Sequence, residues 1–214
     1  MKDNPFLNYR YVIDYDTEQK IDEQLIKDLL KEAIFTTPSK QNMMPYKIHV
    51  IGPGDKKIRQ LLYNKSAGNE DYINEDRVKK QKVIYQYKNF FTAPYIFLFT
   101  QRLSNANPFF QKRLDRGFYY EAVSDLDKCR TTALIEIGMF AHNFGSLCLQ
   151  NKIDVSHTRC IPSHDCWDEP EFYFLQHPVL LIMTIGKRKL TRRDTGIWFD
   201  LDYKPSFDEV VTFV

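Results

Sequence analysis

The segment over residues 36–51, with the sequence TTPSKQNMMPYKIHVI, concentrates groups that could hold a ligand. Pro38 and Pro45 restrict the backbone near its two ends, and between them Ser39 and Asn42 offer a hydroxyl and an amide. The Met-Met pair before the second proline adds soft apolar surface. Such a loop suits a flat ligand with polar edges. On spacing alone, a connection that is merely stiffened by proline and binds nothing is the favoured interpretation.

A second cluster packs two histidines and two cysteines into one short stretch: His157, Cys160, His164 and Cys166. Imidazole and thiolate are the usual ligands of tetrahedral zinc. The spacing is not that of a standard zinc knuckle, and Pro162 limits how tightly the segment can wrap around an ion. We therefore expect ordinary loop histidines and partly buried cysteines here, and no metal. A zinc ion, if bound, would support the structure rather than carry the function.

The elements around the first loop follow from hydrophobic periodicity. Residues 21–35 carry an apolar stripe typical of a helix with one buried face, and the alternation over 47–51 predicts a short strand. The same analysis predicts helices over 55–65, 78–91 and 126–151, and strands over 93–100 and 178–185. Gly138 and Gly145 in the longest helix suggest close packing against another backbone. The loop therefore joins the first long helix to the first strand.

Other segments are expected to be irregular: 66–77, 103–117 and 154–171, together with an exposed basic loop over 187–193. The insertion after residue 103 is long for a connection and carries Phe109 and Phe110. Adjacent aromatic residues usually pack in a core or an interface. As a hypothesis, Phe109 or Phe110 instead closes over a bound ligand and shapes a substrate pocket.

Composition limits the class of protein. The 214 residues suffice for one domain over 1–214 with a real core, and 43% hydrophobic residues exclude a disordered chain. Lys and Arg number 30 against 28 acidic residues, and this weak excess of charge does not point to nucleic acid. No apolar run is long enough to span a membrane or to form a signal peptide. Four cysteines without a C-x-x-C pair indicate a cytoplasmic protein with reduced thiols.

The first loop gains weight from a resemblance. Its pattern P-S-x-x-N-x-x-P followed by an aromatic residue, which ends in Tyr46, resembles the flavin loop of the nitroreductase family. Further similar motifs occur in the same order along the chain: Arg10 upstream, Thr92-Ala-Pro94 before a strand, Glu136, Gly138 and Asn143 in the long helix, Thr184-Ile-Gly186, and Lys204 to Val211. The resemblance covers nearly the whole chain.

This resemblance implies an α+β, nitroreductase-like fold: a central mixed, mainly antiparallel sheet flanked by helices, in an intertwined homodimer with FMN at the subunit interface. Members of the family pass a hydride from NADH or NADPH to flavin N5, and then to a nitroaromatic, a quinone or a similar small-molecule acceptor, by ping-pong turnover. Because the flavin carries this chemistry, no Ser-His-Asp or paired-carboxylate set is required, and none is visible in the sequence.

The resemblance also implies which residues hold the cofactor. Pro38, Ser39, Lys40 and Asn42 of one subunit would meet the isoalloxazine ring and the ribityl chain. The other subunit would neutralise the phosphate with Arg10 and Lys204. The remaining expected contacts are Tyr11, Gln86 and Asn89, the last two near the ribityl or pyrimidine groups, and a backbone N–H near Arg159 or Cys160 that faces N5.

The chain also departs from the family pattern at the phosphate site. The segment from Arg10 to Asp14 keeps one arginine and lacks the serine and second cation that are usual there, and Asp202 stands where some members have a lysine. Each missing charge-assisted contact matters at about 1.5–3 kcal/mol. FMN affinity would then be reduced, unless the basic segment 187–193 substitutes. The alternative function is a flavin- or nucleotide-binding protein of the same fold with reduced catalysis.

Overall fold

The computed structural model describes residues 12–65, 89–119, 125–158, 167, 169–191 and 205–212. Its centre is an antiparallel sheet with the strand order β2-β3-β5-β4. These strands span Tyr46–Ile51 (β2), Tyr95–Gln101 (β3), Val179–Gly186 (β5) and Asp154–Thr158 (β4). A second antiparallel pair joins β1 (Val12–Tyr15) to β6 (Arg188–Thr191). The predicted α+β class is confirmed, and every strand pair within the described residues is antiparallel.

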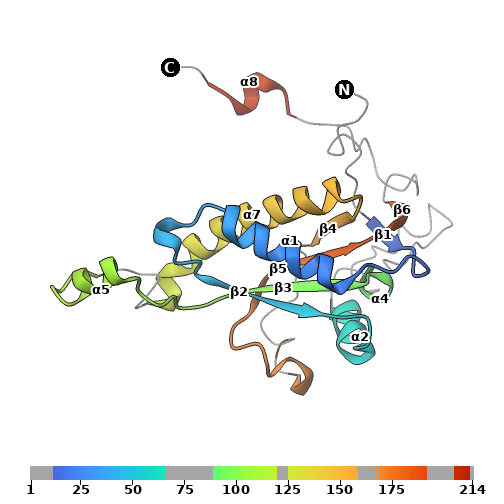
Figure 1. Cartoon of the computed structure of the whole chain (residues 1–214), viewed down its shortest axis with the longest axis horizontal. Coiled ribbons are helices and arrows are strands. Elements are labelled where there is room, and N and C mark those ends of the chain that lie inside the picture. The colour runs from blue at the N-terminus through green and yellow to red at the C-terminus, as the bar shows by residue number, and fades with distance from the viewer. Residues whose placement is uncertain are drawn as a thin grey trace, which may run out of the picture.

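Helices cover both faces of the central sheet (Figure 1). On one face lie α1 (Glu23–Thr36) and α7 (Leu126–Gln150), while α2 (Lys56–Lys65) and α4 (Asn89–Thr92) lie toward the other. The side chains of β3 alternate accordingly: Phe97 and Phe99 pack beneath α7, whereas Ile96 and Leu98 pack with residues of α2 and α4. Burial on both faces explains why β3 and β5 are apolar almost throughout.

The two long helices begin at carboxylate caps. Asp22 accepts a hydrogen bond from the Gln24 N–H at the start of α1, and Asp125 accepts one from the Lys128 N–H at the start of α7. Each cap satisfies one of the amide groups that a helix leaves unpaired in its first turn. Both helices lie within two residues of their predicted bounds. No helix in the described part of the chain is long and apolar enough to cross a membrane.

Three predicted irregular segments contain regular structure. Residues 103–117 include the helix α5 (Pro108–Leu114), residues 154–171 include β4 and the 3-10 turn η5 (Pro170–Phe172), and residues 187–193 include β6. The strands β4 and β6 are too short to show a period, and they form because β5 pairs with β4 and β1 pairs with β6. Of the helix predicted over 78–91, only the end lies within the described residues, and there it forms α4. Two further short elements occur elsewhere in the chain: the 3-10 turn η2 (Lys40–Asn42) and the helix α8 (Phe207–Val210).

The strand β1 is locked against the end of β5. The Tyr15 hydroxyl lies 2.9 Å from the Thr184 carbonyl oxygen, to which it donates, and the tyrosine ring is buried. A Cβ atom at Gly186 would lie 2.5 Å from Tyr15 Cδ1 and 2.8 Å from Pro94 Cδ. Glycine is therefore required at position 186 for the tyrosine to pack here. This contact fixes the position of β1 relative to the end of β5.

A buried arginine joins α2 to α4. Arg59 is only 3% exposed, and its guanidinium donates to the carbonyl oxygens of Phe90 at 3.0 Å and Ala93 at 2.7 Å. It also donates to Gly52 at 2.8 Å. Burial lowers the pKa of Arg59 from its ordinary value. Because α4 is one turn long, the carbonyl groups of Phe90 and Phe91 lack helical partners, and the Arg59 guanidinium supplies their donors.

We expect Arg59→Met to lower the free energy of unfolding by about 3 kcal/mol, because several buried carbonyl groups would lose their donor. The measurement is urea denaturation followed by circular dichroism. Arg130→Met is the matched control, since Arg130 is exposed on α7; it should change stability by less than about 0.5 kcal/mol. Equal effects of the two substitutions would contradict a structural role for the Arg59 contacts.

Candidate functional site

The loop between α1 and β2 has an unusual backbone. Gln41, Asn42 and Met44 adopt φ values of 61°, 56° and 44°, in the left-handed region that side chains other than glycine seldom occupy. The Ser39 hydroxyl oxygen accepts a hydrogen bond from the Met44 N–H at 2.9 Å and so closes the loop. Backbone held in this region persists only where surrounding contacts enforce it, and such segments cluster at functional sites.

Two polar side chains of α7 hold the start of this loop. The buried Glu136 carboxylate accepts a hydrogen bond from the Lys40 N–H, with 3.0 Å between Oε1 and the nitrogen. Seven residues later, Asn143 Nδ2 donates to the hydroxyl oxygens of Thr36 at 2.8 Å and Thr37 at 2.9 Å. A separation of seven residues places the two side chains on one face of the helix, two turns apart. The long helix therefore positions the loop as well as covering the sheet.

The other side of the loop is held by residues that follow β3. Arg102 donates to the carbonyl oxygens of Tyr46 at 2.9 Å and Met43 at 3.3 Å. Asn107 Nδ2 donates to the Gln41 carbonyl oxygen at 3.0 Å. The loop thus has side-chain partners from α7, from the end of β3 and from the start of α5. None of these contacts was predicted, because each depends on residues far apart in sequence.

A buried polar cluster lies beneath the loop. Tyr46 and Gln101 are directly paired across β2 and β3, so their side chains share the face covered by α7. Burial and the nearby Glu136 carboxylate raise the pKa of Tyr46 to about 12. Among the described residues, the Tyr46 hydroxyl, Gln101 Oε1 and Glu136 Oε2 have no hydrogen-bond partner. The phenol therefore stays protonated near neutral pH.

The structure brings together the four predicted loop residues. Pro38, Lys40 and Asn42 are exposed and Ser39 is partly exposed. The Asn42 side chain bonds to no other described residue, so its amide donor and acceptor are available to a ligand. The expectation of soft apolar surface from both methionines is wrong for Met43, which is buried under the loop.

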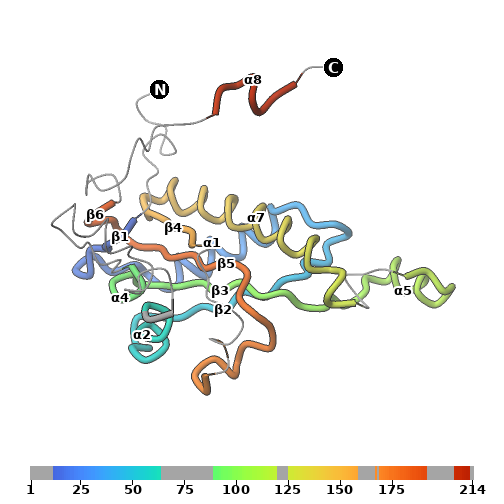
Figure 2. Tube along the Cα trace, turned by 180° about the vertical axis from the view of Figure 1, so that it is seen from behind, coloured from blue at the N-terminus to red at the C-terminus, as the bar shows by residue number. Residues whose placement is uncertain are grey.

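The predicted contact Asn89 lies elsewhere. It is 0% exposed, and neither its amide nitrogen nor its amide oxygen has a partner among the described residues. Asn89 precedes the first residue of β3, whereas the loop lies beside Gln101 at the other end of that strand. Along the strand, the two regions are about 20 Å apart. Figure 2 shows α4 and β1 at one end of the sheet and the loop near α5 at the other.

Several predicted residues lie outside the described residues: Arg10, Tyr11, Gln86, Arg159, Cys160, Asp202 and Lys204, with His164 and Cys166 of the histidine-cysteine cluster. His157 is described, and its largely buried ring lies against α7, where a Cβ on Gly145 would be 3.7 Å from His157 Cε1. Burial lowers the pKa of His157, while a hydrogen bond to the Ala141 backbone opposes this shift. In the described part of the chain, no group of three or more metal-ligating side chains occurs.

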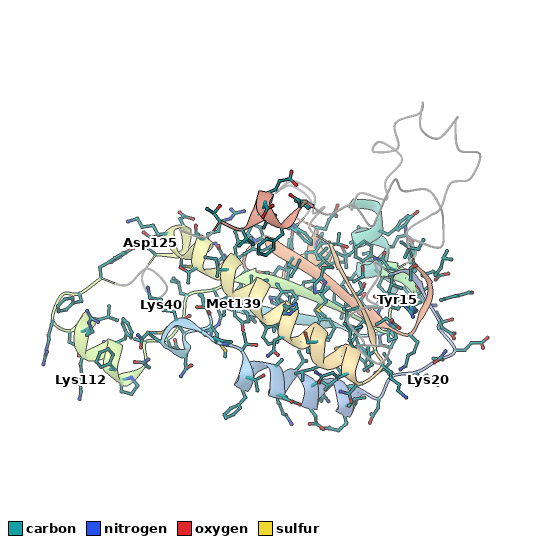
Figure 3. All side chains as sticks on the ribbon, turned by 90° about the horizontal axis from the view of Figure 1, so that it is seen from above. Tyr15, Lys20, Lys40, Lys112, Asp125 and Met139 are labelled. Carbon is teal, nitrogen blue, oxygen red and sulfur yellow. The ribbon has the colours of Figure 1, made fainter. Side chains whose placement is uncertain are left out.

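The two predicted pocket residues differ in their surroundings. Phe109 is 59% exposed, whereas Phe110 is 7% exposed and packs edge-to-face against it with 5.7 Å between the ring centroids. Both lie on α5, whose N-cap residue Asn107 bonds to the loop. Figure 3 shows Lys40 of the loop between Lys112 of α5 and Met139 of α7. An N-cap Asn before Pro108 was the sequence signal that could have predicted this helix.

Comparison with known proteins identifies a family and related folds. Residues 12–156 match the Nitroreductase family. No curated protein matches the chain. Among solved structures, a nitroreductase-like protein from Streptococcus mutans shares 18% identity, with 100% of both chains covered and a TM-score of 0.63.

The names of two further solved structures mention FMN. A provisionally named nitroreductase from Exiguobacterium sibiricum in complex with FMN shares 12% identity, over 99% of this chain and 96% of that chain, with a TM-score of 0.68. A variant of an FMN- and NADPH-dependent nitroreductase from Sphigopyxis sp. strain HMH shares 11% identity, over 98% and 96%, with a TM-score of 0.61. At these identities the likeness shows a common fold.

The Glu136 contact generates a prediction. Glu136→Leu would leave the Lys40 N–H without its acceptor and should lower the free energy of unfolding by about 1–3 kcal/mol. Amide hydrogen exchange at Lys40 should also become at least tenfold faster. Glu136→Gln is the matched control, because its side-chain oxygen can still accept this bond; it should preserve slow exchange. Fast exchange in both variants would show that the loop does not depend on this acceptor.

Proposed function

The chain belongs to the nitroreductase family, and on that premise we propose that it is an FMN-dependent oxidoreductase. It would transfer a hydride from NADH or NADPH through flavin N5 to a nitroaromatic, a quinone or a similar acceptor by ping-pong turnover. The observation that carries the proposal is the family match. It includes the whole loop between α1 and β2, residues 37–45, here named the clamped loop because Glu136 and Asn107 bond to it. The names of two relatives of the same fold, one in complex with FMN and one FMN- and NADPH-dependent, support the choice of cofactor.

The residues present fit a planar cofactor with polar edges. Asn42 offers an uncommitted amide on an exposed loop, and the Asn89 amide is buried without a described partner. Bound FMN would supply the hydride-accepting and hydride-donating centre. The task of this chain is to bind and orient the ring: Pro38, Ser39, Lys40 and Asn42 would meet it, and Arg10 and Lys204, with Tyr11, would hold its phosphate end. The left-handed backbone would keep the loop rigid while doing so.

The separation of the two predicted contact regions supports a site shared by two chains. The loop and Asn89 lie at opposite ends of β3, about 20 Å apart. In a homodimer, the loop of one subunit could face the β1 end of its partner, so that one cofactor meets both regions. The chain offers surface for such an interface: Ile135, Gly138 and Met139 form an exposed stripe on α7.

The C-terminal segment supports the same proposal. Figures 1 and 2 both show α8 standing off the body of the chain. A capping box between Ser206 and Glu209 shapes this helix, while Phe207, Val210 and Val211 are exposed. Apolar side chains presented in this way are expected to be covered by another protein surface. We propose that a second copy of the chain covers them.

A second candidate function is a flavin- or nucleotide-binding protein with reduced catalysis. Two features of the phosphate site favour it: Arg10 is the only cation between residues 10 and 14, and Asp202 stands in place of a cation. Part of the basic segment that could compensate, Arg188 to Thr191, forms the strand paired with β1. Cations of this strand would therefore lie beside the chain that follows Arg10.

Purified protein supplied with excess FMN under anaerobic conditions should lose its flavin absorbance when NADH or NADPH is added. The absorbance should return when a quinone or nitroaromatic acceptor is added. The measurement is a visible spectrum at each step, with free FMN at the same concentration as the control. Flavin that binds but is not bleached by either nucleotide would favour the binding protein.

The phosphate contacts can be tested separately. Arg10→Gln and Lys204→Gln should each weaken FMN binding by about tenfold or more, because each removes a charge-assisted contact. Riboflavin, which lacks the phosphate, is the matched control ligand, and its dissociation constant should change less than twofold. Fluorescence titration measures both. Equal weakening of FMN and riboflavin would mean that these residues support the fold and do not bind phosphate.

A further inference from the structure

The segment Asn107–Tyr119, here named the aromatic lobe, is built as a rigid unit. At its start, Asn107 Oδ1 accepts a hydrogen bond from the Phe110 N–H at 2.9 Å, and Pro108 occupies the first turn. At its end, the Gly117 N–H donates to Leu114 O at 2.8 Å and the Phe118 N–H donates to Arg113 O at 3.0 Å. This pair of bonds is the Schellman motif, and Gly117 has the positive φ of 82° that the motif requires.

This backbone places Arg113 among three aromatic rings. Helical spacing brings Phe109 and Phe110 one turn before Arg113, and the Schellman motif returns Phe118 to the same side chain. The guanidinium carbon lies 4.8 Å from the ring centroid of Phe118, 5.9 Å from that of Phe109 and 5.8 Å from that of Phe110. Rings at these distances attract the cation and restrict its orientation. Phe109 and Phe118 are nevertheless 59% and 54% exposed.

The charge of the lobe is uncompensated. The lobe carries three cations, Lys112, Arg113 and Arg116, and one carboxylate, Asp115, whose Oδ1 already accepts a hydrogen bond from Gln111 Nε2 at 2.8 Å. Arg113 forms no ion pair with any carboxylate in the described part of the chain. A planar guanidinium that is held in place and lacks an anion presents a fork of donors suited to a carboxylate.

The lobe is connected to the clamped loop. Asn107 caps α5 with one amide atom and donates to Gln41 O with the other, so a single side chain joins the two structures. Figures 1 and 2 both show α5 beyond this loop, near the N-terminal end of α7. A ligand seated at the lobe is therefore next to the segment that we propose holds the flavin.

We propose that Arg113 is a specificity-determining residue that favours anionic aromatic acceptors. The acceptor's carboxylate would bind the guanidinium, and its aromatic ring would lie against Phe109 or Phe118. Charge complementarity and exposed aromatic surface on the same rigid turn support this occupant over an uncharged one. The inference rests on the proposed oxidoreductase function, of which it names the acceptor class.

The test compares two acceptors of nearly equal shape, para-nitrobenzoate and the uncharged para-nitrobenzamide, with the FMN-loaded enzyme and saturating NAD(P)H. The wild-type kcat/KM should be higher for the acid. Arg113→Gln should lower kcat/KM for the acid by about tenfold and change that for the amide less than twofold. Arg116→Gln is the matched control, since Arg116 lies on the same lobe and makes no ring contact among the described residues; it should change both less than twofold. The preference for the acid should fall as salt is raised.

Three results would overturn the inference. The first is a wild-type enzyme that shows no preference for the acid, or that reduces a quinone and neither nitro compound; the oxidoreductase proposal would stand in either case. The second is an equal loss for both acceptors in Arg113→Gln. The third is a change in that variant's oligomeric state by size-exclusion chromatography, because the lobe would then bind a second copy of the chain. An enzyme that reduces no acceptor at all would remove the proposed function itself.

Discussion

The structure depends on the hydrogen bonds by which α7 holds the loop that follows α1. Glu136 accepts the Lys40 N–H, and two turns later Asn143 donates to Thr36 and Thr37. A loop with three left-handed residues would be costly as an isolated peptide, and these contacts make it the stable conformation. The same helix packs Ile137, Phe140 and Phe144 into the core beneath, so loss of the core would also release the loop. Site and fold are stabilised together.

The central sheet sets the distance between the two halves of the proposed cofactor site. Antiparallel pairing of β2 with β3 puts the clamped loop at one end, and α4 with the Tyr15–Gly186 contact at the other. If both regions meet the cofactor, as we propose, a single chain presents two incomplete sets of contacts. An exposed stripe on α7 and a C-terminal helix that stands off the body are consistent with completion by a second chain. On this account, dimerisation is a requirement for binding the cofactor.

The sequence predicts the long elements and the loop, and it fails where structure depends on distant residues. The helices α1 and α7 carry buried apolar residues at helical spacing and begin at caps, so their bounds are close to those predicted. The strands β4 and β6 exist because β5 and β1 pair with them. Glu136 and Lys40 are 96 residues apart, and no local pattern joins them. The helix α5 could have been predicted from its capping residues, Asn107 and Gly117, which an analysis of hydrophobic periodicity alone does not use.

The central claim is that one cofactor is held by two chains, and a mixed dimer tests it most directly. One subunit carries Asn42→Leu, which removes the loop amide and disfavours its left-handed backbone; the other carries Arg10→Gln and Lys204→Gln. Each variant alone should bind FMN poorly. A heterodimer isolated through two affinity tags should recover one high-affinity FMN site, because one loop and one phosphate-binding set remain intact and face each other. A heterodimer that binds FMN as poorly as its parents would contradict the shared site.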